Sequence, residues 1–164
     1  MGHNRSSGNA MANTLATAHF LAHGGTLGAL AHISEDDLHT LYAYARQCVK
    51  AGDVKTAESL FDSLFCLDAW NLSYALASGL CRQMRGAHQE ALAYFARAAI
   101  IAPDDPQPAW YAALSYQKLG HATYARQAFS NVLSCALSQP RHAEWEQKSR
   151  QALAELGLSA NRRT

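Results

Sequence analysis

The sequence is poor in charged residues. Only 16% of its 164 residues are Asp, Glu, Lys or Arg, against roughly 25% in ordinary soluble domains, while 49% are apolar. The formal net charge is +1, so no overall field draws the chain toward nucleic acid or an anionic membrane. This composition indicates that much apolar surface is buried within the fold or is used to hold a partner.

Long hydrophobic runs and paired cysteines are also missing. No stretch approaches the roughly 18 apolar residues that a membrane span needs. The apolar segment 15–22 is interrupted by Thr17 and His19, which makes it a poor signal-peptide core. The four cysteines (Cys48, Cys66, Cys81 and Cys135) form no Cys-x-x-Cys pair, so we expect buried free thiols in a reducing compartment. We predict a cytoplasmic protein without stable membrane association and without nucleic-acid binding.

Catalytic motifs are absent as well. The sequence has no Gly-x-Ser-x-Gly turn, phosphate-binding loop or dinucleotide fingerprint. His19 and His23 have a helical spacing that can bind metal, but neither an intervening glutamate nor a third ligand is apparent. Glu90 and the pair Asp104-Asp105 fit helix starts better than catalytic roles. We therefore predict no catalytic residues, no metal site, no cofactor and no enzyme activity.

What the sequence does contain is an internal repeat. Glycines stand at 52, 86 and 120, and the separations 86 − 52 and 120 − 86 are both 34 residues. Two further sets keep this spacing: Ala57, Ala91 and Ala125, and Phe61, Phe95 and Phe129. A period of 34 residues is typical of tetratricopeptide (TPR) repeats, each a pair of helices. We predict an all-α fold with three TPR helix pairs in a right-handed superhelix, an N-terminal helix and a C-terminal capping helix.

Capping signals divide the chain into three parts. Ser34 followed by acidic residues predicts a helix start near residue 35, and Asp105-Pro106 predicts another. We expect an N-terminal tail and short helix in 1–33, and repeats in 34–139, at about 38–71, 72–105 and 106–139. A capping helix and tail should occupy 140–164, because the last repeat of a solenoid otherwise exposes an apolar face.

One face of the first helix of each repeat should line the hollow of the superhelix. With the repeat glycine as position 15, positions 2, 5, 9 and 12 share that face. The predicted groove residues are His39, Tyr42, Arg46 and Val49, then Ser73, Leu76, Leu80 and Gln83, then Gln107, Trp110, Leu114 and Gln117. Several are large and apolar, and an exposed apolar stripe is typical of a binding site. Alternatively, a terminal helix folds back and covers the stripe.

The polar residues of this face are mostly neutral, and Arg46 is its one cation. A clamp for acidic chain ends would need more cations, so that function is disfavoured. An extended apolar peptide fits better, because its side chains can enter pockets while glutamines bind its backbone.

Short segments around the repeats resemble a known family, the class II chaperones of type III secretion translocators, over roughly residues 20–156. The segments are Gly24-Gly25-Thr26-Leu27, Leu41-Tyr42, Leu67-Asp68-Ala69-Trp70, Gly79-x-Cys81-Arg82-Gln83, and Pro108-Ala109-Trp110 with Ala112-Ala113. The resemblance implies a cytoplasmic bacterial protein that binds hydrophobic translocator proteins and keeps them soluble before secretion. It implies that a short extended segment containing proline and leucine lies in the TPR hollow.

Carried over by position, the resemblance assigns the pockets to Tyr42, Leu76, Leu80, Gln83, Trp110 and Leu114. Arg46 and Val49 stand where many relatives carry aromatic residues, which implies a first pocket that is shallower or prefers a different side chain. The N-terminal helix of the family often mediates homodimers, which implies an interface at Leu15, Phe20 and Leu21. The alternative function is a generic TPR scaffold or regulatory adaptor that joins folded proteins.

Overall fold

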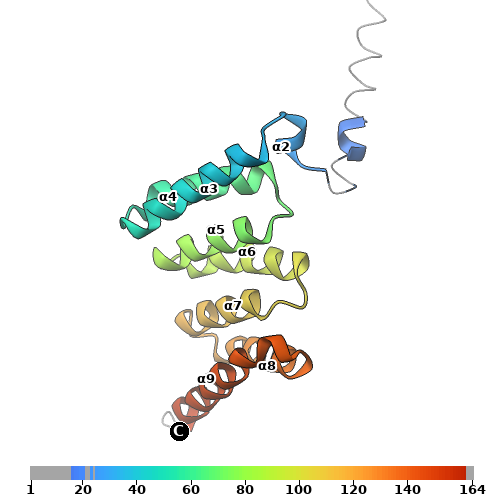
Figure 1. Cartoon of the computed structure of the whole chain (residues 1–164). Coiled ribbons are helices and arrows are strands. Elements are labelled where there is room, and N and C mark those ends of the chain that lie inside the picture. The colour runs from blue at the N-terminus through green and yellow to red at the C-terminus, as the bar shows by residue number, and fades with distance from the viewer. Residues whose placement is uncertain (1–15, 21–22, 24, 162–164) are drawn as a thin grey trace, which may run out of the picture.

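Three antiparallel helix pairs are stacked one on the next in the computed structural model, which describes residues 16–20, 23 and 25–161 (Figure 1). The pairs are α3 (Glu35–Lys50) with α4 (Val54–Leu67), α5 (Leu72–Met84) with α6 (His88–Ile101), and α7 (Pro106–Lys118) with α8 (Ala122–Ser138). The short helix α2 (Leu27–Leu30) precedes them, and a 3₁₀ turn η1 (Pro140–His142) and helix α9 (Ala143–Asn161) follow. The predicted all-α TPR fold is confirmed.

The repeat glycines form the turn between the two helices of each pair. Gly52, Gly86 and Gly120 have φ angles of +84°, +80° and +75°, in the left-handed region that residues with a Cβ rarely adopt. A Cβ placed on any of the three would meet no other atom within 4 Å. The glycines are therefore required by the backbone conformation of the turn, and not by close packing.

Side-chain caps fix where the first helices begin. Ser34 Oγ accepts a hydrogen bond from the backbone N–H of Asp37 and donates to its carboxylate, as the sequence predicted for α3. Asn71 is the N-cap of α5, and its side-chain oxygen accepts hydrogen bonds from the backbone N–H groups of Ser73 and Tyr74. Asp105 caps α7, with Pro106 in the first turn, where a missing N–H costs nothing.

The core is a row of hydrophobic clusters, and each cluster joins three successive helices. The first joins α3, α4 and α5, the second joins α5, α6 and α7, and the last two join α7, α8 and α9. The repeated alanines at 57, 91 and 125 are completely buried and let each pair pack closely. Gly79 allows a still closer approach, because a Cβ there would lie 2.5 Å from the Phe95 ring.

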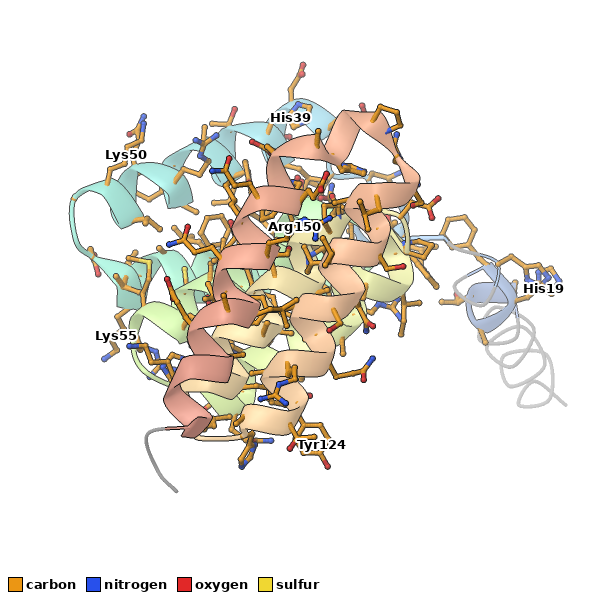
Figure 2. All side chains as sticks on the ribbon, turned by 90° about the horizontal axis from the view of Figure 1, so that it is seen from below. His19, His39, Lys50, Lys55, Tyr124 and Arg150 are labelled. Atoms are coloured by element: carbon orange, nitrogen blue, oxygen red, sulfur yellow. The ribbon has the colours of Figure 1, made fainter. Side chains whose placement is uncertain are left out.

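The C-terminal helix lies across the end of the stack beside α8 (Figure 2). Trp145 and Ala152 of α9 are nearly buried against the last repeat, which is the capping role expected of this segment. In the segment 140–164, where a capping helix and tail were expected, Pro140–His142 form a 3₁₀ turn and α9 continues from Ala143 to Asn161. Proline supports such a turn because its fixed φ suits the first position.

Two of the four cysteines depart from the expectation of burial. Cys48 and Cys81 are buried, whereas Cys66 is exposed and Cys135 is partly exposed. All four are free thiols. Cys66 lies on α4 and lines a hollow of about 810 Å³ together with Asp62 of the same helix and Arg85.

Within the part of the chain that the structure describes, no helix combines the length and the apolar character that crossing a bilayer would take.

Candidate peptide-binding groove

A first hollow lies between α3 and α5 on the face predicted to line the groove. It encloses about 310 Å³. Tyr42, Arg46 and Val49 of α3 line one side, at predicted groove positions. Leu80 of α5 lies opposite them and is also a predicted residue. Predicted groove residues from the first helices of two successive repeats thus line one cavity.

The floor of this hollow is apolar and its rim is basic. Tyr42 packs edge-on against the buried Phe61 ring, with centroids 5.5 Å apart, and lies 5.6 Å from the ring of Tyr74. Arg46 and Lys50 are exposed at the rim. A cavity of this kind suits an aliphatic side chain of a bound segment, with polar backbone or acidic groups outside it.

A second hollow, of about 380 Å³, lies between α7 and α9. The predicted residues Trp110, Leu114 and Gln117 line it from α7. Sequence reasoning missed its other wall, which α9 supplies through Lys148, Gln151, Ala152 and Glu155. Their helical spacing on one face was a usable signal, but the segment was interpreted only as a cap.

Gln83 lies between the two hollows and is held by the protein itself. Its Nε2 donates to the backbone carbonyl of Tyr111 at 2.7 Å and to Ser115 Oγ at 2.8 Å. The amide was expected to bind a peptide backbone, but in this structure its donor group links α5 to α7. Gln83 therefore fixes the spacing of the two repeats at the centre of the face.

Leu76 and Trp110 are more buried than residues of an exposed apolar stripe would be, and both pack against the core. Leu76 is only 9% exposed and belongs to the core cluster around Phe95. Trp110 is half-buried, and its ring centroid lies 5.1 Å from Phe129 and 5.6 Å from Trp145. The terminal-helix alternative thus applies in part: α9 covers one edge of Trp110, yet it extends the groove as a wall of the second hollow.

The remaining predicted residues lie toward the starts of their helices and line neither hollow. His39 and Ser73 are exposed, His39 in the second turn of α3 and Ser73 in the first turn of α5. Figure 2 shows His39 and Lys50 at opposite ends of α3. Gln107 is partly buried, and its backbone N–H is bound by the Asp105 carboxylate at 2.8 Å.

An ion-pair network behind the first hollow holds α4, α5 and α6 together. The nearly buried Arg82 of α5 makes two hydrogen bonds, of 2.9 and 2.8 Å, to the carboxylate of Asp62 on α4. Its guanidinium also lies over the ring of Tyr94 on α6, 4.1 Å from the centroid. The hydrogen bonds to Asp62 raise the pKa of Arg82, so the charge is permanent.

The thiol next to this arginine is kept neutral. Burial is the main cause that raises the pKa of Cys81 to about 11, and the carboxylates of Glu58 and Asp62 act in the same direction. Cys81 lines the first hollow and remains an uncharged, weakly polar wall at neutral pH.

Of the three residues expected at a dimer interface, the structure describes Phe20. Leu15 and Leu21 lie outside the described residues. Residues 16–20 are helical, and the Phe20 side chain is 40% exposed. His19 and His23 stack on each other with centroids 4.0 Å apart, and no group of three or more His, Cys, Asp or Glu side chains converges in the described residues.

The fold defines a TPR protein, and side chains from the first helices of its repeats line two hollows. The chain matches no protein-family model. It is 33% identical over 99 residues to the low calcium response locus protein H of Yersinia pestis, a match that spans 60% of this chain and 59% of that relative.

Solved structures extend the similarity over most of the chain. A type III secretion complex from Aeromonas hydrophila superposes with a TM-score of 0.83 at 27% identity, covering 89% of this chain and 97% of the other. PcrH, a protein of Pseudomonas aeruginosa, in complex with the chaperone-binding region of PopB, superposes with a TM-score of 0.70 at 30% identity, covering 74% and 98%. The chain belongs to the family of type III secretion translocator chaperones.

Proposed function

We propose that this protein is a cytoplasmic chaperone that binds hydrophobic translocator proteins and keeps them soluble before type III secretion. An extended segment of the client lies along the α3, α5, α7 and α9 face. The protein acts by binding, with no chemical step.

The first hollow is the observation that carries this proposal. Its aromatic and aliphatic floor is formed around Tyr42, Phe61 and Leu80, between α3 and α5. Such a preformed apolar cavity suits a side chain of an extended peptide. PcrH, which shares the fold at 30% identity, has been crystallised with the chaperone-binding region of PopB, and this supports the binding of a client segment by the present chain.

Co-expression with a translocator protein of the same bacterium tests the proposal. Leu80→Glu places a charge in the first hollow, and we expect the client to move from the soluble to the insoluble fraction. Ile100→Glu is the matched control, because Ile100 is 66% exposed on the outer helix α6 and lines neither hollow. Trp110→Glu is a poorer choice, since Trp110 also packs against Phe129 and Trp145.

Circular dichroism of both variants must show unchanged helicity for the comparison to hold. A soluble client with Leu80→Glu would show that the groove assignment is wrong. Capture of a folded partner, with no effect on translocator solubility, would favour the scaffold or adaptor function.

We also propose a homodimer through the N-terminal segment, supported by the exposed Phe20. Phe20→Glu should convert a dimer to a monomer in light scattering of the purified protein. A wild-type monomer at all concentrations would contradict this interface.

A further inference from the structure

Residues at equivalent positions of the 34-residue repeat line the two hollows. Trp110, Leu114, Gln117 and Phe129 line the second hollow, and each lies two repeat periods after a residue of the first: Tyr42, Arg46, Val49 and Phe61. On the opposite walls, α9 residues 148, 151, 152 and 155 keep the spacing of α5 residues 77, 80, 81 and 84. The α7/α9 junction therefore reproduces the α3/α5 junction, with α9 acting as the first helix of a fourth repeat.

The chemistry of the two opposite walls differs. The first hollow has Ala77, Leu80, Cys81 and Met84 on α5, all of them apolar or weakly polar. The second has Lys148, Gln151, Ala152 and Glu155 at the matching places on α9. Its aromatic part, Trp110 and Phe129, is retained. The second hollow thus combines an apolar surface with a polar rim.

The polar rim has acceptors available beside its internal bonds. Gln151 Nε2 donates to Glu155 at 3.0 Å, and a carboxylate can accept several further hydrogen bonds. The Lys148 ammonium already has partners within α9, since it lies 3.8 Å from the Glu144 carboxylate and 4.5 Å from the Trp145 ring centroid. A side chain with a long aliphatic stem and a donor at its end fits these surroundings: its stem packs on Trp110 and its end reaches Glu155.

Gln83 separates the two hollows at the α5/α7 junction, through its bonds to Tyr111 and Ser115. Packed helices lie about 8–10 Å apart, and the hollows are two such steps from each other, about 16–20 Å. An extended peptide rises about 3.3 Å per residue and points alternate side chains to one face. Two side chains that enter one hollow each must therefore be an even number of residues apart. At a rise of about 3.3 Å per residue, a separation of about 16–20 Å corresponds to about six residues.

We propose that the α7/α9 hollow is a second side-chain subsite for the same extended client segment, which takes Gln, Lys or Arg about six residues from the aliphatic residue in the α3/α5 hollow. This rests on the proposed function of the groove. The first subsite selects for apolar character, and the second adds specificity through hydrogen bonding.

Selection from a phage-displayed library of random 16-residue peptides on the full-length protein tests the subsite. Enriched peptides should pair an aliphatic residue with Gln, Lys or Arg six positions away. The best peptide is then labelled, and its Kd is measured by fluorescence anisotropy. Gln151→Trp, which fills the second hollow from an exposed position, should weaken binding about tenfold.

Gln127→Trp is the matched control, because Gln127 is exposed on α8 and lines neither hollow. It should leave Kd within about twofold. Replacing the long polar residue of the peptide by alanine should cost about tenfold with the wild-type protein and little with Gln151→Trp. This pairing shows that the two side chains act at one place, independently of any effect on folding.

Peptides with an aliphatic anchor alone, or equal binding by Gln151→Trp and wild type, would overturn the second subsite and leave the proposed function standing. No enriched peptide from the library would count against both. Preference for acidic residues at the second position would assign the hollow to Lys148 and overturn the proposed donor specificity.

Discussion

Gln83 on α5 donates a 2.7 Å hydrogen bond to the backbone carbonyl of Tyr111 on α7, across the junction between the second and third repeats. The same amide nitrogen also reaches Ser115 Oγ at 2.8 Å. A groove residue that is engaged in this way sets the distance between the two repeats, and with it the distance between the two hollows.

Gln83→Leu should therefore lower the free energy of unfolding by about 1–2 kcal/mol, because both hydrogen bonds are lost in a partly buried place. Urea denaturation followed by circular dichroism measures the change. Gln89→Leu, at an exposed position on α6, should stay within about 0.5 kcal/mol of wild type. Equal stability of the two variants would show that the Gln83 bonds contribute nothing net.

Arg82→Met should be more damaging than any surface arginine substitution. It leaves the Asp62 carboxylate unpaired and removes the contact with Tyr94. We expect a loss of about 2–3 kcal/mol, below the roughly 3–5 kcal/mol of fully buried pairs, because Asp62 reaches solvent. Arg150→Met, which breaks the exposed pair with Glu146, should cost under about 1 kcal/mol. Similar losses in both would contradict a structural role for the network.

Gly79→Ala and Gly157→Ala should change stability in opposite directions. Both glycines lie within helices, where alanine is favoured by about 0.5–1 kcal/mol. At Gly157 a Cβ meets nothing within 4 Å, so that variant should gain about this amount. At Gly79 the Cβ would overlap the Phe95 ring, so thermal unfolding should occur several degrees lower. A stabilised Gly79→Ala would mean that Phe95 moves aside at little cost.

Thiol reactivity should follow exposure along the chain. At pH 8, Ellman's reagent should modify Cys66 first and Cys135 more slowly, while Cys48 and Cys81 react only as the protein unfolds. The Cys66→Ser variant should lose the fast phase. A fast phase that persists in this variant would place an accessible thiol elsewhere.

Stability should fall in alkaline solution partly because of Cys81. Its pKa is raised to about 11 in the folded protein from an ordinary value of 9.0, so the unfolded chain releases this proton first. The contribution is fully present below about pH 9 and is lost as the pH rises toward 11. Cys81→Ala should show a smaller loss of unfolding free energy across that window than wild type. Parallel pH profiles of the two proteins would show that burial does not raise the pKa of the Cys81 thiol.

The sequence by itself determined the repeat and most of the helix ends. A 34-residue period, glycines at the turns, and Ser34 and Asp105 as caps act through local backbone geometry, which a pattern of residue types can report. Burial of the repeated alanines and phenylalanines follows from the same periodicity.

Only the tertiary structure decided which face residues are open. Leu76 and Leu80 occupy neighbouring groove positions on α5, yet Leu76 is buried against Phe95 and Leu80 lines a cavity. Gln83 is turned inward by partners on α7, far away in sequence. The spacing of the α9 wall residues of the second hollow places them on one helical face, but which helix that face meets depends on long-range packing of the capping helix.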